Sequence, residues 1–533
     1  MPDIIDRAIA FRKRMFVRQV DARRIRKVVR NLNIQKKDAG KKPVILFNAS
    51  TRLEGMSQNA GFSLITSWAL RMSGTRVIHF VCKSGMKKCV LGTNKDDADK
   101  SPPCRRCIQQ SRNMYWNSEI IWYDYQPDLD LAKQINNLDL SELTAFEYDG
   151  YPLGEIVLPS LRWILRRHHL EDNATNRQFY REYILSAWNI AKKFSELIET
   201  VKPEAVVVFN GMFYPEAMAK IIARNAGIRT ITHEVSLQPL SAFFTYGEAT
   251  AYPIDIPDSF HLSTNQNAIL DDYLDRRFQG DFSMAGVRFW PEIKRVSQEF
   301  LEKAANFQQI VPVFTNVVFD TSQGHANVIV DNMFEWLDVV LEIIISHPET
   351  LFVLRAHPDE LRPGKESQET VAGWVEKTQA ASLPNVIFYD AQVYISSYDL
   401  IKHAKLVMVY NSTIGLEASV MGAAVLCGGK ARFTQIPTVF YPHSVQEYLQ
   451  RADEMLAANV VEVPEQFRIN ARRFLYSQLF IYSLPFYDFL KSDGIWNGYV
   501  SLKNFQSHDL HPKNSATVRS LLNGILEGKD FTT

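Results

Sequence analysis

The sequence predicts an α/β protein built from two Rossmann-like domains. The chain has 533 residues, and single hydrophobic cores stop growing at roughly 250–300 residues, so two domains are expected. Short apolar segments alternate with helical segments, which is the pattern of parallel βαβ units. The alternation occurs in two series, separated by a junction near residues 260–308. Hydrophobic residues make up 46% and charged residues 22% of the chain, as in ordinary globular proteins.

The first series defines a domain over residues 43–265. A polar turn that begins at Asn48 and ends at Gly55 follows its first strand. The predicted strands are Pro43–Phe47, Arg76–Cys82, Glu119–Tyr123, Glu204–Phe209 and Arg229–Thr232. The predicted helices between them are Gly61–Met72, Asn176–Val201 and Pro215–Asn225.

The second series defines a domain over residues 300–463, and a helical tail over 464–533 follows it. In this tail, Pro464–Leu490 reads as one long aromatic-rich helix. The predicted strands of the second domain are Ile310–Phe314, Thr350–Arg355, Asn385–Tyr389, Leu406–Tyr410 and Ala424–Cys427. Its predicted helices include Val330–Ile345 and Ile414–Met421.

Residues 1–42 form a basic extension with fourteen Lys and Arg against four Asp. Its apolar residues recur at helical spacing from Asp3 to about Asn33. Such a helix can lie on an anionic membrane surface, or it can pack on its own domain with a solvated basic face, and both interpretations stay open. The net charge of +1 gives no reason to expect nucleic acid.

No signal peptide and no apolar stretch of the ~20 residues that a bilayer requires is visible in the sequence. We therefore expect a cytoplasmic protein, peripheral at the inner face of the plasma membrane if the basic helix binds lipid. Five cysteines in a chain of this length also suit a reducing compartment.

Four of the cysteines fall within twenty-six residues: Cys82, Cys89, Cys104 and Cys107. Four thiolates suit a structural zinc ion or an iron–sulfur cluster. The spacing matches no standard zinc ribbon, and a redox pair or free thiols are the alternatives. Cys427 lies in an apolar strand and is expected in the core.

Polar residues follow two strands of the second domain, at the sheet edge where parallel α/β proteins bind ligands. Arg355 and His357 leave the strand at 350–355. Ser412 and Thr413 lie between another strand and a helix, where hydroxyls and free backbone N–H groups can bind an anion. A carboxylate one turn into that helix, Glu417, can accept hydrogen bonds from ribose hydroxyls.

These motifs resemble the C-terminal half of GT-B glycosyltransferases that build capsules and other surface polysaccharides. The resemblance is to bacterial Kdo transferases and, more distantly, to sialyl- and CDP-glycerol transferases, and it covers roughly residues 310–429. The motifs are Arg355, His357, Pro358 and Glu360, then Asn411-Ser412-Thr413-Ile414-Gly415-Leu416-Glu417-Ala418 and Gly422-Ala423-Ala424-Val425. Ala424 departs from the family, where Pro often precedes this Val.

The resemblance implies two Rossmann-like domains that face a central cleft, with a nucleotide sugar bound mainly by the second domain. The donor would be CMP-, CDP- or UDP-linked, and the acceptor a saccharide or lipid-linked saccharide of capsule or lipopolysaccharide. His357 with Ser412 and Thr413 would hold the donor phosphate, and Glu417 the ribose. The reaction would need no catalytic divalent metal. The other residues expected to bind the donor are Thr315, Asn316, Arg355, Glu360 and Asn411.

A transferase of this kind also needs a base for the acceptor hydroxyl. Glu234, at the end of a first-domain strand, is the first candidate, and Asp320 in the second domain is the alternative. Acceptor or cleft residues are expected after the first-domain strands: Asn48, Ser50, Asn210 and Gly211.

Several alternatives stay open. Glu234 could be an ordinary loop carboxylate, Arg355 could pair with Glu360, and the hydroxyls before Ile414 could cap a helix, worth ~1 kcal/mol. The chain could be a sugar-nucleotide 2-epimerase, which needs no acceptor, or a non-catalytic metal-binding scaffold.

Overall fold

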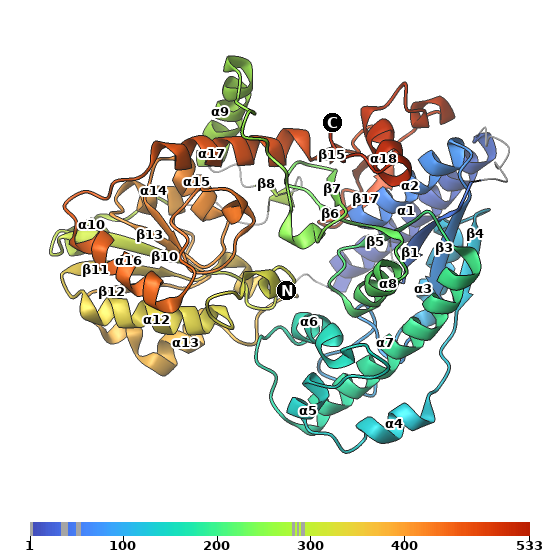
Figure 1. The fold of residues 1–533 in the computed structure, drawn as a ribbon, viewed down its shortest axis with the longest axis horizontal. Coiled ribbons are helices and arrows are strands. Elements are labelled where there is room, and N and C mark those ends of the chain that lie inside the picture. The colour runs from blue at the N-terminus through green and yellow to red at the C-terminus, as the bar shows by residue number, and fades with distance from the viewer. Residues whose placement is uncertain (1–3, 33–40, 50–54, 280–282, 285–286, 289–293) are drawn as a thin grey trace.

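The computed structural model describes the chain except for residues 1–3, 33–40, 50–54, 280–282, 285–286 and 289–293. The described residues form two lobes, each built on a parallel sheet, with the first lobe to the right and below and the second to the left (Figure 1). The expectation of two Rossmann-like α/β domains is confirmed.

The first sheet has seven strands in the spatial order β15-β7-β6-β5-β1-β3-β4. The five strands from β6 to β4 run parallel to one another. Strand β7 pairs antiparallel with β6, and β15 pairs antiparallel with β7. Every residue of the central strand β1 is buried, because helices cover both faces. The strand bounds are β1 Val44–Asn48, β3 Val77–Cys82, β4 Glu119–Tyr123, β5 Ala205–Phe209, β6 Arg229–Val235, β7 Ser241–Thr245 and β15 Leu484–Pro485.

Two apolar cores lie on the two faces of this sheet. Alternate residues of β1 enter different cores, Ile45 and Phe47 on one face and Val44 and Leu46 on the other, as the twofold repeat of a strand requires. Helices on the first face are α4 Leu129–Ile135, α5 Leu140–Thr144, α6 Leu153–Leu165, α7 Ala174–Val201 and α8 Tyr214–Asn225. Helices on the second face include α1 Ile4–Asn31, α2 Gln58–Met72 and α18 Ala516–Glu527.

The second sheet has five parallel strands in the order β12-β11-β10-β13-β14. Their bounds are β10 Gln309–Phe314, β11 Thr350–Arg355, β12 Val386–Tyr389, β13 Val407–Val409 and β14 Val425–Cys427. One face packs on α12 Met333–Ser346, α13 Val371–Thr378 and α16 Val445–Ala457. The other packs on α14 Ser397–Lys402, α15 Ile414–Val420 and α17 Glu465–Tyr476.

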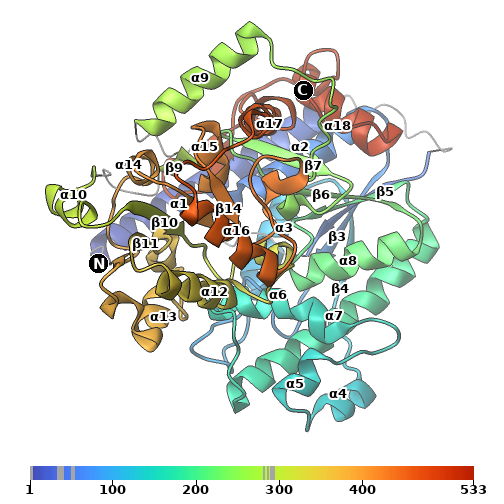
Figure 2. The same ribbon diagram turned by 60° about the vertical axis from the view of Figure 1, so that its left-hand side comes forward.

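The junction between the sheets contains α9 Thr264–Phe278, the short hairpin β8 Ser283–Met284 and β9 Val287–Arg288, and α10 Gln298–Ala304. Ser263 and Gln266 form a capping box at the start of α9. Figures 1 and 2 both show α9 at the periphery of the molecule, next to α17. One further short helix, α11 Gln323–Ala326, follows β10.

The C-terminal tail differs from the single long helix predicted for 464–490. Helix α17 and one π turn over Ser477–Ile481 are followed by short strands. Leu484 and Phe486 are fully buried in the first domain's core, so packing against that domain outweighs continuation of the helix. Beyond β15, the strands β16 Leu490–Ser492 and β17 Tyr499–Leu502 pair with each other, and β17 pairs with β2 Met56–Ser57. The tail therefore ties the second domain back to the first.

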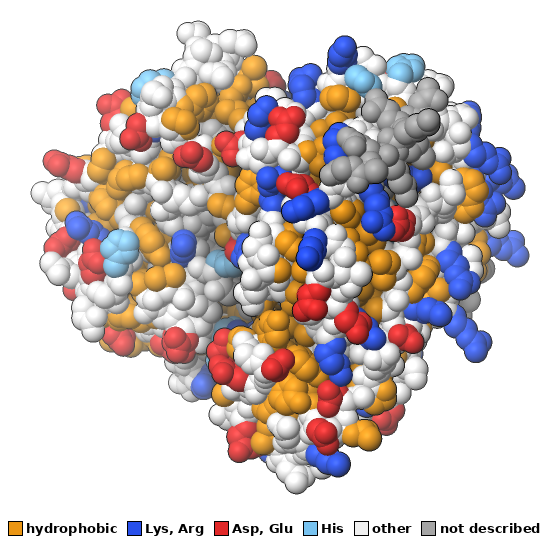
Figure 3. All heavy atoms as spheres, turned by 45° about the vertical axis from the view of Figure 1, so that its right-hand side comes forward, with side chains coloured by type: hydrophobic (Ala, Val, Ile, Leu, Met, Phe, Trp, Pro, Cys, Tyr) orange, Lys and Arg blue, Asp and Glu red, His pale blue; other side chains and the backbone are white. Residues whose placement is uncertain are grey.

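The basic extension is helical as predicted, and α1 is packed on the first domain. Ile25, Val29 and Leu32 are buried in its core, while Arg14 stacks on Trp496. Helix α1 also contacts α3, which spans Cys104–Met114. Figure 3 shows Lys and Arg side chains gathered along one edge of the molecule, on the side of the first domain. Among the residues that the structure describes, no helix is long and apolar enough to cross a bilayer.

Candidate active site

A cavity of about 690 Å³ lies between the two domains and is called the interdomain cavity below. Its first-domain wall comes from the end of β6 and the loop after β7, including Glu248 and Thr250. Its second-domain wall comes from segments that follow β10, β11, β13 and β14. This is the sheet edge at which parallel α/β domains bind ligands. The second-domain lining includes Asn316, Asp320, His357, Asn411, Ser412, Thr413, Glu417 and Lys430.

A smaller cavity of about 80 Å³, the side cavity, adjoins the interdomain cavity. The two share five lining residues: Arg277, His357, Ser412, Thr413 and Glu417. Thr315 and Arg355 line the side cavity as well. Of the nine residues predicted to bind the donor, eight therefore line one or both of these cavities.

His357 contacts both cavities and accepts a hydrogen bond on one ring nitrogen. The backbone N–H of Asp359 donates to its Nδ1 at 3.1 Å, so in the neutral ring the proton resides on Nε2. Burial lowers the pKa of His357, although the carboxylate of Asp359 opposes this shift. The imidazole is thus neutral near pH 7 and acts as a hydrogen-bond donor through Nε2.

Arg355 is a buried cation at the carboxyl end of β11. One guanidinium nitrogen donates to the carbonyl of Ile395 at 3.0 Å, and its Nε is buried without a hydrogen-bond partner in the described structure. Burial lowers the pKa of Arg355 to about 10, so the side chain stays charged at pH 7. Thr315 is directed to the same strand end, where its hydroxyl donates to the carbonyl of Arg355. A buried arginine with spare donors suits an anionic ligand.

The segment before α15 presents polar groups to the cavities. The backbone N–H of Asn411 donates to the side-chain oxygen of Asn316 at 3.4 Å, which joins the ends of β10 and β13. Thr413 occupies the N-cap position, yet its side chain makes no capping hydrogen bond. Thr413, like Ser412, lines both cavities.

Glu417 lies one turn into α15 and is held from both sides. Its Oε1 accepts a hydrogen bond from Nε of Arg277 at 2.7 Å, and its Oε2 accepts one from the hydroxyl of Tyr398. Burial opposes the charge of Arg277, but the carboxylate of Glu417 raises its pKa overall. Arg277 belongs to α9, so the junction helix is fastened to the second domain beside the site.

Glu360 lies apart from both cavities. It is fully buried, and its carboxylate accepts hydrogen bonds from the backbone N–H of Val371 at the start of α13. Burial raises its pKa to about 8, so the group is protonated near pH 7. No ion pair between Glu360 and Arg355 occurs within the described chain. The structure thus places Glu360 in the packing of α13, and unlike the other residues predicted to bind the donor it lines neither cavity.

A third cavity of about 380 Å³, the first-domain cavity, contains Glu234 and His233 in its lining. Glu234 accepts hydrogen bonds from Asn210 at 2.8 Å and from Asn59 at 3.2 Å, and its own strand supplies a third from the N–H of Val235. Burial raises the pKa of Glu234 in spite of these contacts. Glu234 is half-buried, and an oriented carboxylate with a raised pKa has the properties of a general base.

Asp320 lines both the first-domain cavity and the interdomain cavity. It follows β10, and its carboxylate accepts the backbone N–H of Ser322 at 2.8 Å. Its neighbour Thr321 accepts a hydrogen bond from Asn210 at 3.4 Å, which links the two domains at this point. The two carboxylates that the sequence suggested as bases thus come from different domains and approach the same region.

The remaining predicted cleft residues differ in their surroundings. Asn48 lines the first-domain cavity, but its side chain is engaged by Leu46, Ser63, His79 and Tyr115. Gly211 has a φ of +83°, which allows the sharp turn after β5 that presents Asn210. Ser50 lies outside the described residues.

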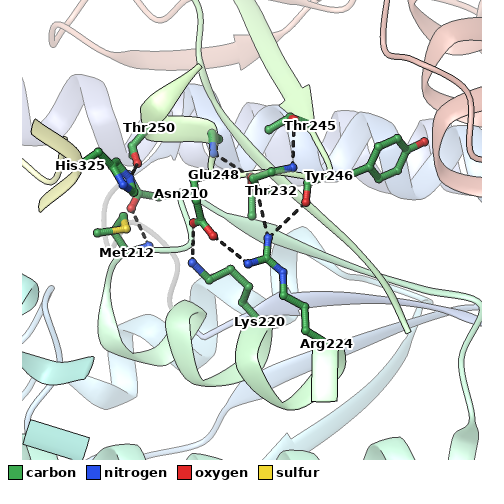
Figure 4. Close-up of polar contacts among 12 residues, drawn as sticks. Asn210, Met212, Lys220, Arg224, Thr232, Thr245, Tyr246, Glu248, Thr250 and His325 are labelled. Carbon is green, nitrogen blue, oxygen red and sulfur yellow. Dashed lines mark hydrogen bonds and ion pairs between the residues drawn. The ribbon is translucent and has the colours of Figure 1, made fainter. Parts of the chain in front are cut away.

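A charged network closes the first-domain side of the interdomain cavity (Figure 4). Glu248 accepts contacts from Lys220 at 2.5 Å and Arg224 at 2.8 Å, both on α8. Burial alone would raise the pKa of Glu248, but Lys220 and Arg224 lower it. Close by, Thr250 and Nε2 of His325 are hydrogen-bonded at 2.8 Å across the two domains.

Sequence reasoning missed Arg277, Lys430, Glu248 and His325, which all line the interdomain cavity. Lys430 follows Gly428 and Gly429 at the end of β14, so the strand-end rule that selected Arg355 could also have selected it. Nothing in the local sequence marks Arg277, because its partner lies 140 residues away.

The four clustered cysteines line a fourth cavity, of about 30 Å³. None of the four forms a disulfide within the described residues, and Cys427 is buried in the core of the second domain as expected. In the described part of the chain, no three His, Cys, Asp or Glu side chains converge on one point as ligands of a single metal ion.

Residues 298–473 match the family model described as capsule polysaccharide biosynthesis protein. No curated protein matches the chain. The solved structures similar to it include the KpsC β-Kdo 2,4 transferase of Thermosulfurimonas dismutans, with 11% identity over 56% of this chain and 84% of that chain and a TM-score of 0.37. A putative UDP-N-acetylglucosamine 2-epimerase from Listeria monocytogenes has 12% identity, coverages of 82% and 95%, and a TM-score of 0.26. MnaA from S. aureus, solved with UDP, has 11% identity, coverages of 92% and 98%, and a TM-score of 0.27.

The family match runs from α10 to α17 and includes every residue predicted to bind the donor. The second domain therefore carries the pattern of the capsule polysaccharide biosynthesis family, as its motifs predicted.

Proposed function

We propose that the chain is a glycosyltransferase that moves a sugar from a nucleotide-sugar donor to a saccharide acceptor during surface polysaccharide synthesis. One observation carries the proposal: a cavity lined by cations and hydroxyls shares Asp320 with a second cavity that contains the half-buried carboxylate of Glu234. A donor site and an acceptor site that meet at a base are what direct transfer between two substrates requires.

The donor would occupy the interdomain and side cavities. Arg355 and His357 line the same cavity as Ser412 and Thr413, and together these side chains offer hydrogen-bond donors to phosphate oxygens. The negative charge that develops on the leaving nucleotide would be stabilised by these fixed groups in a largely buried site. Because the chain's own groups supply this stabilisation, the proposed reaction uses no catalytic divalent ion.

The acceptor would occupy the first-domain cavity, with its hydroxyl next to Glu234. Asn210 and Asn59 hold the carboxylate in place through one oxygen each. Burial raises the pKa of Glu234, which makes the carboxylate a stronger base than an exposed glutamate. Asp320, on the opposite domain, is the second candidate for this role.

A panel of CMP-, CDP-, UDP- and GDP-sugars tests the proposal by thermal shift. A ligand that binds only the native state raises the apparent Tm, and we expect one nucleotide class to do so in the wild type and to lose the effect in His357→Ala. Transfer is then measured with that donor and a set of saccharide acceptors.

Two results would contradict the proposal. If no nucleotide sugar in the panel shifts the Tm, the cavities do not form a donor site. If the active donor is converted to its 2-epimer without any acceptor, the chain is an epimerase instead.

We further propose that the outer face of α1 docks on an anionic membrane surface, such as the inner face of the plasma membrane. The exposed residues of this helix include Arg12, Lys13, Arg23, Arg26, Lys27 and Arg30. Ile9 and Phe16 project among them with 46% and 67% of their surface exposed. Cations combined with exposed apolar side chains favour an interfacial helix over one that is merely solvated.

Point variants test docking better than deletion, because the inner face of α1 is part of the first domain's core. Phe16→Ser combined with Arg23→Glu and Lys27→Glu should reduce sedimentation with phosphatidylglycerol vesicles and spare activity on soluble substrates. Charge reversal at Lys133, an exposed cation on α4, serves as the matched control. Equal vesicle binding by all forms would rule out docking through α1.

A further inference from the structure

We propose that Cys82, Cys89, Cys104 and Cys107 bind one iron–sulfur cluster. The sequence left zinc, a cluster, a redox pair and free thiols open, and the geometry of the four thiols distinguishes among them.

The four thiols come from three elements and surround one space. Cys82 is the last residue of β3, Cys89 lies in the loop that follows, and Cys104 and Cys107 occupy the first turn of α3. All four line the same cavity of about 30 Å³, called the cysteine cavity. The rest of its lining is mostly apolar: Ala49, Met86, Leu91, Pro102, Pro103 and Ile108, with Ser84 and Gly92. A space with four soft ligands and little else that is polar selects a thiophilic centre.

The placement of the thiols favours a cluster over a single zinc ion. In a tetrahedral site with Zn–S bonds of about 2.3 Å, the sulfurs stand only ~3.8 Å apart around one ion. In the described part of the chain, no three Cys, His, Asp or Glu side chains converge on one point in this way. In a cluster the cysteines bind different irons at the periphery, so four sulfurs that line one cavity need not meet at a single ion.

Backbone groups around the cavity suit thiolate ligands. The N–H of Gly85 donates to Sγ of Cys82 at 3.2 Å. A Cβ at position 92 would lie 3.0 Å from Sγ of Cys89 and 2.5 Å from Cβ of Pro102, so only glycine allows the loop to approach this closely. Hydrogen bonds to the sulfurs are among the features that tune protein-bound clusters.

Each of the four thiols would release one proton to solvent as its iron–sulfur bond forms. Iron ions and inorganic sulfide are the required co-reactants.

The cluster would shape the acceptor side of the proposed active site. Met86, Cys89 and Leu91 line both the cysteine cavity and the first-domain cavity. The loop that carries them, residues 83–103, has no regular helix and consists largely of turns and bends. A four-point attachment would fix this wall, so we expect loss of the cluster to raise the KM for acceptor more than the KM for donor.

Metal and sulfide analysis of the full-length chain, purified without oxygen or reconstituted with ferrous iron and sulfide, tests the proposal. We expect bound iron with acid-labile sulfide and a visible charge-transfer absorption. Cys104→Ser with Cys107→Ser should abolish both signals, whereas Cys427→Ser, which changes the remaining cysteine, should keep them. These signals do not depend on catalysis, so they test the cluster independently of the proposed transferase activity.

Three outcomes would overturn the cluster. They are one equivalent of zinc without sulfide, a disulfide between Cys104 and Cys107, and four thiols that titrate freely in the folded reconstituted protein. The wild-type measurement decides among them even if the double variant does not fold.

Discussion

The two sides of the candidate active site hold their polar groups in opposite ways. In the first-domain cavity, Glu234 is surrounded by partners that orient it, and Asn48 is saturated by four neighbours. In the side cavity, Arg355 has a buried Nε with no hydrogen-bond partner among the described residues. A fixed carboxylate is suited to act on a bound group, and a cation with spare donors is suited to bind one. In the proposed function, chemistry and donor binding are therefore divided between the two domains.

The largest expected effect comes from Glu234→Gln, which keeps the shape of the side chain and removes the base. We expect transfer to slow by about 10²–10⁴-fold, because that is what a general base contributes. Donor affinity, measured separately by titration, should stay unchanged. The wild-type rate should also fall as the pH drops below the pKa of Glu234, because the base must be deprotonated. Burial raises that pKa above the ~4.3 of an ordinary glutamate.

Asp320→Asn is the matched control for this variant. If it slows transfer more than Glu234→Gln does, the base belongs to the second domain and the division between the domains is wrong.

Glu360→Gln tests whether this carboxyl is structural. Its folded pKa of about 8 lies above the unfolded value, so its contribution to stability is complete below about pH 4.3 and is lost as pH rises through about 8. Between pH 6 and pH 9 the wild type should therefore lose roughly 3 kcal/mol of unfolding free energy that the variant does not lose. Urea unfolding at both pH values measures this. A large loss of donor affinity in Glu360→Gln would instead return this residue to the donor site.

His357→Ala removes one hydrogen-bond donor from the phosphate side. Loss of a hydrogen bond to a charged group costs about 1.5–3 kcal/mol, so we expect donor affinity to fall by about tenfold or more. Isothermal titration with the donor measures the change, and His357→Gln, which retains an N–H donor, should recover part of it. Unchanged affinity in His357→Ala would remove the residue from the site.

The smallest effect is expected from Tyr398→Phe, which removes the hydroxyl that donates to Glu417. Loss of a single hydrogen bond costs about 1 kcal/mol, so the KM for donor should rise by about fivefold while kcat at saturating donor stays the same. If kcat falls and the KM for donor does not change, Glu417 takes part in the chemical step and not in ribose binding.

Much of the fold was predictable because buried parallel strands are short, apolar and bounded by turns. The ten predicted strands were all found, most within one residue of their predicted ends, and the helices that cover them were found too. The tail was the exception. Its aromatic residues fit a helical period as well as a strand that joins another domain's sheet, and only the distant core that buries Leu484 and Phe486 decides between them.

The sequence by itself determined which residues follow the strands of the second domain, and so it predicted Arg355, His357, Ser412 and Glu417 as one site. It could do so because the carboxyl ends of parallel strands meet at one edge. Tertiary structure alone decided that Glu360 turns away from that edge and that Arg277 approaches it from α9. Such pairings depend on how separate elements pack, and local patterns carry no record of a partner more than a hundred residues away.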